Sequence, residues 1–306
     1  MVDTKHAFSA DYFDEEERFG FKVDKARKEI WAVELDLLYE LDRVCNKLSL
    51  QYSLAYGTLI GAVRDGRFIP WDDDIDVVML REDYDVLISM GPDEFQFPYF
   101  LQTGYNDHDF FRGHAQLRNS TTCGALPKEL MEVKFNQGIF IDIIVIDSYN
   151  DDQLDMLYAK KKSFYRKRRV MMNRLHGGII RNSILRCWRP FLMLKYHDTH
   201  ELYREYDSLF SKTKDGEFVD ALMFWKQSSQ IKHFKREWLE KTHRVPFEDG
   251  MFPIPDHYDE ILSLIYGNDY MIPKMVSNTH NLEGQVIFDT NRSYLDVIKE
   301  RRNSDV

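Results

Sequence analysis

The strongest hydrophobic periodicity in the chain lies between residues 25 and 50, where apolar side chains recur every three or four positions. This spacing places them on one face of a helix, so residues 25–50 are predicted to form an amphipathic helix. A short strand is predicted over 52–55, followed by a turn at Gly57-Thr58 and a helix over 58–65. The apolar positions of the first helix are Ile30, Val33, Leu37, Leu38, Leu41, Val44 and Leu48.

Two later apolar runs each enclose an acid. The run 75–80 is interrupted only by Asp76, and residues 138–147, GIFIDIIVID, enclose Asp142. Runs of this length predict buried strands, and a buried carboxylate needs a partner. We favour Asp142 as the functional acid of the second run. The alternatives are that it only accepts backbone N–H bonds, or that Asp147 takes its role.

The remaining pattern predicts a core followed by a mainly helical part. Residues 1–24 are expected to form a polar segment, 25–150 the core, and 151–306 a helical part that completes the same unit. The other predicted elements are a helix over 83–90 that ends at Gly91-Pro92, strands over 96–103 and 112–118, mostly helix over 151–243, an extended Pro-rich segment over 245–256, and a final helix that ends at Gly267.

Four carboxylates, Asp72, Asp73, Asp74 and Asp76, lie within five positions. In an extended segment the first, third and fourth of these share one face and Asp73 takes the other. Carboxylates packed together repel unless a cation joins them, and Mg²⁺ or Mn²⁺ prefers such oxygen ligands. The pattern therefore indicates a divalent cation site, the alternative being a solvated Asp-rich turn.

A phosphate site is indicated directly before the acids. The turn at Gly57 and Thr58 precedes a predicted helix, and helix N-termini present free N–H groups that bind phosphate. A cation beside a phosphate is typical of phosphoryl transfer.

The stretch YGTLIGAVRDGRFIPWDDDIDVVM, residues 56–79, resembles the LicD family of phosphotransferases, which includes fukutin and its relatives. QLRNSTT at 116–122, GIFIDIIVID at 138–147 and YGNDYMIP at 266–273 are similar to later blocks of that family. The resemblance implies an α/β (α+β) fold, with a nucleotidyltransferase-like mixed β-sheet core, flanking helices and a helical addition. It also implies a metal site made by Asp74, Asp76 and Asp142 on neighbouring strands, with Asp72 as a further ligand or base.

The same resemblance implies an activity. Family members move phosphocholine from CDP-choline, or other phosphoalditols from CDP donors, onto cell-surface glycans. We therefore expect a metal-dependent phosphotransferase with Mg²⁺ or Mn²⁺, a CDP-linked donor, with CDP-choline favoured, and a glycan or lipid-linked glycan acceptor. The alternatives are a nucleotidyltransferase that acts from an NTP, or a non-catalytic protein that docks on membranes.

Several other residues are candidates for substrate binding. Arg118 either binds the donor phosphate through two N–H groups of its guanidinium, as a fork, or is a surface arginine of a strand. The same two interpretations apply to Arg64 and Arg67. His280 is more often structural in such a position than a site residue. An aromatic cage for choline can draw on Tyr56, Trp71, Tyr99 and Phe100.

The net charge of −10 is unevenly distributed. Residues 160–195 hold 12 Lys or Arg and no Asp or Glu, interleaved with aromatic residues. This basic stretch can contact an anionic substrate or membrane surface, or it can be a solvated or acid-paired face. Nucleic acid is disfavoured as a partner by the overall acidity.

Three widely spaced cysteines, Cys45, Cys123 and Cys187, give neither a disulfide framework nor a metal-ligand spacing. A reducing compartment is therefore expected. The first 20 residues are polar and acidic, and the sequence contains no run of 18 apolar residues. We expect a cytoplasmic protein, with a peripheral position at the inner face of the cell membrane as a further option.

Overall fold

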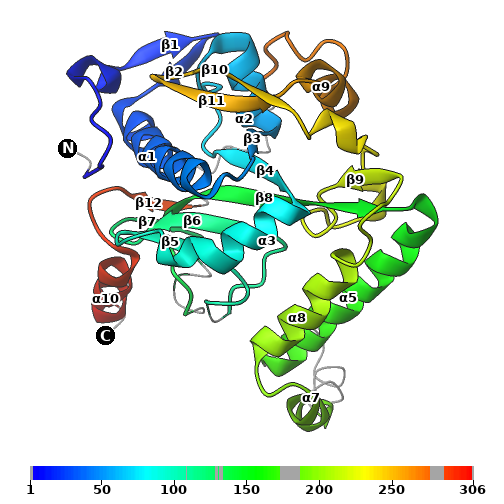
Figure 1. The fold of residues 1–306 in the computed structure, drawn as a ribbon. Coiled ribbons are helices and arrows are strands. Elements are labelled where there is room, and N and C mark those ends of the chain that lie inside the picture. The colour runs from blue at the N-terminus through cyan, green and yellow to red at the C-terminus, as the bar shows by residue number, and fades with distance from the viewer. Residues whose placement is uncertain are drawn as a thin grey trace.

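A mixed β-sheet forms the centre of the protein (Figure 1). The computed structural model describes residues 3–107, 109–127, 130, 134–172, 187–275 and 286–304. The strand order is β3-β4-β8-β6-β5, and β9 pairs with the far end of β8. Strands β4 and β8 are parallel, whereas the other neighbours are antiparallel. The predicted α/β (α+β) class with a mixed sheet is confirmed. The strands are β3 (Ser53–Leu54), β4 (Asp76–Leu80), β5 (Tyr99–Gln102), β6 (Ala115–Asn119), β8 (Ile139–Tyr149) and β9 (Phe218–Asp220).

Strand β8 is the central strand, because both of its long edges are paired and its side chains are mostly buried. Its apolar sequence suits a strand covered on both faces. Helix α1 (Lys25–Leu48) packs against β8 and β6 and confirms the predicted helix. Asp24 caps this helix by accepting a hydrogen bond from the backbone N–H of Arg27.

Helix α2 (Tyr56–Ile60) begins two residues earlier than predicted, so the turn predicted at Gly57-Thr58 is wrong. The backbone N–H of Ala55 still bonds to Asp76, and the carbonyl of Ala55 already accepts the first helical bond, from Leu59. The chain therefore passes from strand to helix without a loop. The helix continues as a π-helical turn, η2, over Gly61–Asp65.

In the described part of the chain, three two-stranded sheets surround the centre. The predicted extended segment 245–256 forms most of a hairpin of β10 and β11. The pairs are β1 (Glu16–Arg18) with β2 (Phe21–Val23), β10 (Thr242–Phe247) with β11 (Gly250–Pro255), and β7 (Cys123–Ala125) with β12 (Ile287–Asp289). The remaining helices outside the arm described next are α3 (Arg81–Met90), α9 (Tyr258–Tyr266), α10 (Tyr294–Ser304), and the short 3-10 turns η1 (Ala10–Phe13), η3 (Gly91–Asp93), η4 (Asp151–Gln153), η5 (Ser228–Gln230) and η6 (Arg236–Trp238).

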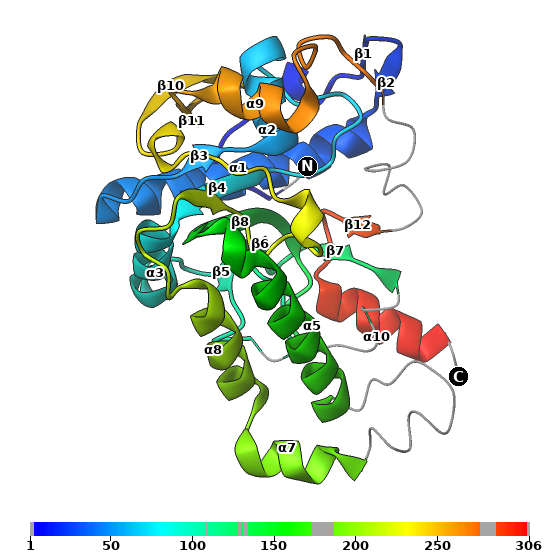
Figure 2. The same ribbon diagram turned by 90° about the vertical axis from the view of Figure 1, so that its right-hand side faces the viewer.

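An arm of helices projects from the sheet away from α1 (Figures 1 and 2). It consists of α5 (Leu154–Met171), α7 (Arg189–Lys195) and α8 (Thr199–Phe210). Phe164 of α5 stacks on Tyr206 of α8, with ring centroids 4.0 Å apart. Among the described residues, the mainly helical structure predicted over 151–243 is therefore confirmed by α5, α7 and α8, but it is wrong beyond Phe210, where β9 and 3-10 turns follow.

Buried ion pairs attach the arm to the sheet. Arg81, at the start of α3, lies 2.7 Å from the carboxylate of Asp147 on β8 and 3.0 Å from that of Asp207 on α8. Asp147 is 1% exposed, so these contacts are shielded from solvent. Arg81 therefore joins the arm to the sheet by pairing with Asp207 and Asp147, which accounts for the second acid of the apolar run.

The basic side chains of the stretch 160–195 make different kinds of contact. The structure describes residues 160–172 and 187–195 of this stretch, whereas residues 173–186 lie outside the described part, as does His280. Lys167 and Lys195 both pair with Glu205 of α8. Lys161 is buried and donates hydrogen bonds to the carbonyls of Leu222, Met223 and Trp225. Part of the stretch is thus acid-paired or structural.

The described part of the chain contains no helix that combines the length and the apolarity needed to span a bilayer. The three cysteines are free thiols, two of them buried and Cys187 exposed.

We predict that Lys161→Met lowers the free energy of unfolding by about 3 kcal/mol, because three buried carbonyls lose their hydrogen-bond donor. Chemical denaturation measures this change. Lys160→Met is the matched control, since Lys160 is exposed on the same helix. Equal stability of the two variants would contradict a structural role of Lys161.

Candidate active site

The parallel pairing of β4 and β8 places two acids side by side. Asp76, the first residue of β4, is the register partner of Asp142 on β8. Paired positions on neighbouring strands point to the same face of a sheet. The two acids that interrupt the apolar runs therefore lie at one place, although 66 positions separate them in the sequence.

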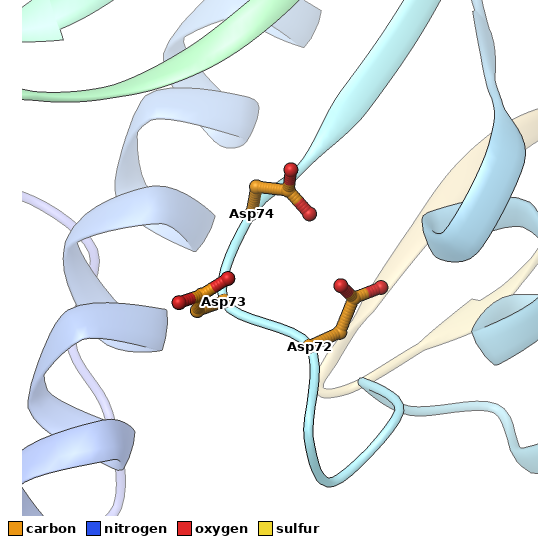
Figure 3. A group of neighbouring side chains, drawn as sticks. All are labelled: Asp72, Asp73 and Asp74. Atoms are coloured by element: carbon orange, nitrogen blue, oxygen red, sulfur yellow. The ribbon is translucent and has the colours of Figure 1, made fainter. Parts of the chain in front are cut away.

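Asp72, Asp73 and Asp74 lie in the segment just before β4. One carboxylate oxygen from each of the three lies within 4.8 Å of the others. Asp72 and Asp74 point to one side, whereas Asp73 turns toward α1 (Figure 3). The alternation expected for an extended segment thus holds for these side chains, although β4 itself begins only at Asp76. The predicted ligands Asp76 and Asp142 are not part of this three-membered group.

Helix α1 fixes the backbone of the acidic segment. Arg27 and Trp31 donate side-chain hydrogen bonds to the carbonyl of Asp72, at 3.1 and 3.0 Å. The Trp31 ring is itself stacked on Phe68, with centroids 4.6 Å apart. Two buried donors on one carbonyl hold the segment in a single position.

Helix α2 supports the acids from another side. The hydroxyl of Thr58 accepts the backbone N–H of Asp76 at 3.0 Å. A Cβ atom added at Gly57 would lie 2.3 Å from Oδ2 of Asp72, so only glycine lets this carboxylate approach the helix. In this structure both residues, which we predicted to bind phosphate, contact the acidic segment.

Glu34 of α1 is a further acid of the site that the sequence reasoning missed. It is 2% exposed, and its Oε2 has no hydrogen-bond partner among the described residues. Burial raises its pKa well above the ordinary value, and the charges of Asp74, Asp73 and Asp72 raise it further. A signal was present, because Glu34 stands four positions after Ile30 and seven before Leu41, on the apolar face of the predicted helix.

Crowding also raises the pKa of two acids of the segment 72–76. The pKa of Asp72 is raised well above its ordinary value by burial and by Asp74. The pKa of Asp76 is raised by burial and by the charges of Asp74, Asp142 and Asp72. Without a cation, this cluster favours partial protonation.

Asp142 has a different environment. Burial acts to raise its pKa, but the net effect is a lowered pKa, because His114 and Gln116 bond to its Oδ1 and Arg112 lies near. The His114 Nε2 atom is 3.0 Å away, and Gln116 donates from Nε2 at 2.5 Å. Asp142 is therefore held ionised and oriented by its neighbours.

Arg118 is buried, with 1% exposure, so the interpretation as a surface arginine is wrong. It donates to the side-chain oxygens of Gln102 and Gln116 and to the carbonyl of Gly138. Through Gln116 it orients Asp142. Its role as a phosphate fork stays a prediction, which its place on the wall of a cavity beside Asp142 allows.

A cavity of about 350 Å³ opens on the acids Asp72, Asp74 and Asp76. Arg64 lines this cavity but also forms a bidentate ion pair with Asp65. Among the other lining residues are Gly57, Trp71 and Lys274, and the aromatic rings of Tyr56, Tyr266 and Tyr270. We call it the aromatic cavity.

Two of the four aromatic residues predicted for a choline cage do not line this cavity. Tyr99 and Phe100 lie on β5, where the Tyr99 hydroxyl donates to Asp36. Tyr266 and Tyr270, which follow much later in the sequence, line it beside Tyr56 and Trp71. Sequence proximity to the acids was therefore a poor guide to the cavity wall. Arg67 is half exposed and pairs with Glu16, away from this wall.

Two more cavities lie beside Asp142. One of about 230 Å³ runs from Glu34, Asp73 and Asp74 to Asp142. The second, of about 780 Å³, extends from Asp142 toward α5 and is lined by several basic residues. We call it the basic cavity. The acids thus lie between two cavities that share no lining residue.

A family model described as LicD/FKTN/FKRP, nucleotidyltransferase domain, matches residues 49–164. These residues are a LicD-family domain. The resemblance inferred from the sequence motifs is therefore confirmed for this part of the chain. The chain is also 25% identical over 247 residues to the lipopolysaccharide cholinephosphotransferase LicD of Haemophilus influenzae, an alignment that covers 78% of this chain and 88% of that protein.

The site extends beyond the LicD-family domain. The domain contains Gly57, the acidic segment 72–76 and Asp142. Glu34 precedes it on α1, and Tyr266 and Tyr270 follow it. The flanking parts of the chain therefore complete the walls of the site.

The acids of the LicD-family domain fit a hard divalent cation. The neighbouring donors are carboxylate oxygens, which Mg²⁺ and Mn²⁺ prefer. A buried oxygen of Glu34 lacks a hydrogen-bond partner among the described residues, and Gly57 leaves room for the Asp72 carboxylate. Asp72, Asp73 and Asp74 can hold such a cation. Asp76 and Glu34 interact electrostatically with these acids and would add negative charge near the cation.

We predict that Asp74→Asn raises the free energy of unfolding by about 1 kcal/mol at neutral pH when a chelator removes metal ions. The substitution removes a negative charge that repels three neighbouring carboxylates. The folded protein binds more protons at Glu34, Asp72 and Asp76 than the unfolded chain does, above the ordinary pKa values of 3.8 to 4.5. This contribution to stability is full below that range and is lost as the pH rises through the raised pKa values.

The advantage of Asp74→Asn should therefore grow as the pH rises from about 4 to about 8. Thermal melts of both proteins in EDTA across this range measure it. Asp93→Asn, an exposed acid outside the site, serves as the control. An advantage that is absent or independent of pH would show that the acids do not repel in this way.

Proposed function

We propose that the protein is a metal-dependent phosphotransferase that moves a phosphate-linked head group from a CDP-linked donor onto a glycan or lipid-linked glycan, with release of CMP. The observation that carries the proposal is the pairing of Asp76 with Asp142 beside the carboxylates of Asp72, Asp73 and Asp74. The LicD-family domain and the name of the H. influenzae relative support a cell-surface glycan as acceptor and phosphocholine as head group.

The aromatic cavity suits the donor. Its rings, Tyr56, Trp71, Tyr266 and Tyr270, can stack on a cytosine base or surround a quaternary ammonium group. Its other wall is formed by the acids, so a donor that lies there would bring its diphosphate to them. Both features support CDP-choline as the donor.

When bound, Mg²⁺ or Mn²⁺ would neutralise the phosphate oxygens. Asp72, Asp73 and Asp74 would hold it, and Asp76 and Glu34 would add negative charge around it. The remaining chemistry falls to Asp142, which His114 and Gln116 keep ionised and oriented.

In the proposed reaction a hydroxyl oxygen of the acceptor bonds to the phosphorus that carries the head group. The bond between that phosphorus and the oxygen of CMP breaks, and the proton of the hydroxyl passes to the Asp142 carboxylate. Asp142 suits this role because it lies on the walls of both cavities that extend away from the aromatic one.

We predict that the protein releases CMP from CDP-choline in the presence of Mg²⁺ and of lipopolysaccharide as the acceptor, and that Asp76→Asn lowers the rate about a hundredfold or more. Asp93→Asn should keep the rate of the wild type, because Asp93 is exposed and outside the site. Chromatography of the nucleotide products, with Mg²⁺ and again with EDTA, provides the measurement.

The product also separates the alternatives. Release of pyrophosphate from CTP or another NTP would replace the proposal by nucleotidyl transfer. Absence of any nucleotide turnover, with binding to membranes unchanged in Asp76→Asn, would favour the non-catalytic alternative.

We also propose that the arm contacts an anionic membrane through α7, at the inner face of the cell membrane. This helix lies at the end of the arm farthest from the sheet (Figures 1 and 2). Trp188, Phe191 and Leu194 are 60%, 67% and 80% exposed, beside the basic Arg189 and Lys195. Exposed aromatic and aliphatic side chains among cations are typical of helices that lie in a membrane interface.

We predict that the protein binds vesicles containing phosphatidylglycerol, and that the double variant Phe191→Asp/Leu194→Asp weakens this binding about tenfold. The control Met90→Asp/Phe97→Asp changes two exposed apolar residues outside the arm. Co-sedimentation with vesicles measures binding. Equal binding to phosphatidylcholine vesicles, or equal loss in the control, would contradict the proposal.

A further inference from the structure

The basic cavity has a strongly positive lining. Arg112, Lys162, Arg168 and Lys226 all border it. Lys161 borders it too, but its ammonium group is committed to three backbone carbonyls. The acids on the wall are Asp109 and Asp142.

The position of one guanidinium group is fixed by the cavity wall. Arg168 lies over the ring of Phe111, 4.4 Å from its centroid, and donates to the carbonyl of Asp109 at 3.3 Å. Lys162 and Lys226 are exposed lysines from α5 and from the segment after β9. Cations from separate parts of the chain thus converge on a single space of about 780 Å³.

Aromatic rings form another part of the wall, and they lead to Asp142. Phe224 and Trp225 pack against each other, with ring centroids 5.1 Å apart. Phe224 also contacts the ring of His114, at 5.2 Å, and His114 bonds to Asp142. A sugar ring that stacks on these side chains would hold its hydroxyl groups near the Asp142 carboxylate.

The basic cavity is separate from the aromatic one but connected with the acids. The two cavities share no lining residue. The small cavity between them shares Asp74 with the aromatic cavity, and Arg112 and Asp142 with the basic cavity. Two substrates can therefore reach the acids from different sides.

We propose that the basic cavity binds the acceptor, and that this acceptor is a glycan that carries a phosphate group. The assignment of the ligand as acceptor rests on the proposed function, because a transferase needs a second substrate site. The phosphate follows from the lining, since guanidinium and ammonium groups recognise phosphate through charge-assisted hydrogen bonds. The sugar part follows from the aromatic wall beside Asp142.

The test is a calorimetric titration of the full chain with glucose 6-phosphate, glucose and inorganic phosphate, without donor and without metal. We expect glucose 6-phosphate to bind, and to bind more tightly than either glucose or phosphate alone. The double variant Lys162→Glu/Lys226→Glu should weaken this binding about tenfold.

The control variant Lys160→Glu/Lys214→Glu makes the same change in net charge at two exposed lysines outside the cavity. It should bind glucose 6-phosphate within about twofold of the wild type. Lys162→Gln/Lys226→Gln is a milder cavity variant, and circular dichroism verifies that each variant is folded.

Three results would overturn the proposal: no binding of glucose 6-phosphate, equal binding of inorganic phosphate, or equal loss in the cavity and control variants. The titration does not depend on the donor, so its outcome is independent of CMP release. If glucose 6-phosphate binds in the cavity but CDP-choline gives no CMP, the proposed function fails and the anion site remains. If CMP is released but glucose 6-phosphate does not bind, only the present proposal fails.

Discussion

Repulsion among carboxylates held in a partly dry place is the constraint on which the site depends. Asp72, Asp73, Asp74 and Asp76 come from one segment, and α1 adds Glu34 from the other side. Several contacts of the fold hold them together: two donors from α1 on the Asp72 carbonyl, a glycine that admits its carboxylate, and the register of β4 with β8. Such an arrangement costs stability until a cation arrives, and it needs little rearrangement when one does.

Asp142 differs from these acids, although it lies next to them. Its partners are the donors His114 and Gln116, and Arg118 supports Gln116 from within the sheet. Crowding raises the pKa of Asp76, whereas hydrogen bonds and nearby cations lower that of Asp142. Neighbouring carboxylates with divergent proton affinities are typical of sites in which each acid has a separate role.

The sequence predicts those parts of the fold and site whose pattern lies within a single helix, strand or short segment. The period of α1, the apolar run of β8 and the acids before β4 each predict their element. What could not be predicted depends on contacts between distant segments. Arg118 was uncertain because only the fold shows that β6 is buried. Tyr266 and Tyr270 line the same cavity as the acids but come from α9 and the residues after it. No local sequence pattern predicts that these distant segments meet. Glu34 was missed although its place on an apolar face was a local signal.

Helix α5 has two tasks at adjacent positions. Lys161 ties the arm to the carbonyls of the segment 222–225, and Lys162, one residue later, borders the basic cavity. Successive residues of a helix differ in direction by about 100°. An insertion or deletion of one residue at the start of α5 would therefore rotate both lysines out of place together. The attachment of the arm and the charge of the cavity thus depend on the same rotation of α5 about its axis. This part of the chain should therefore tolerate substitutions far more readily than insertions or deletions.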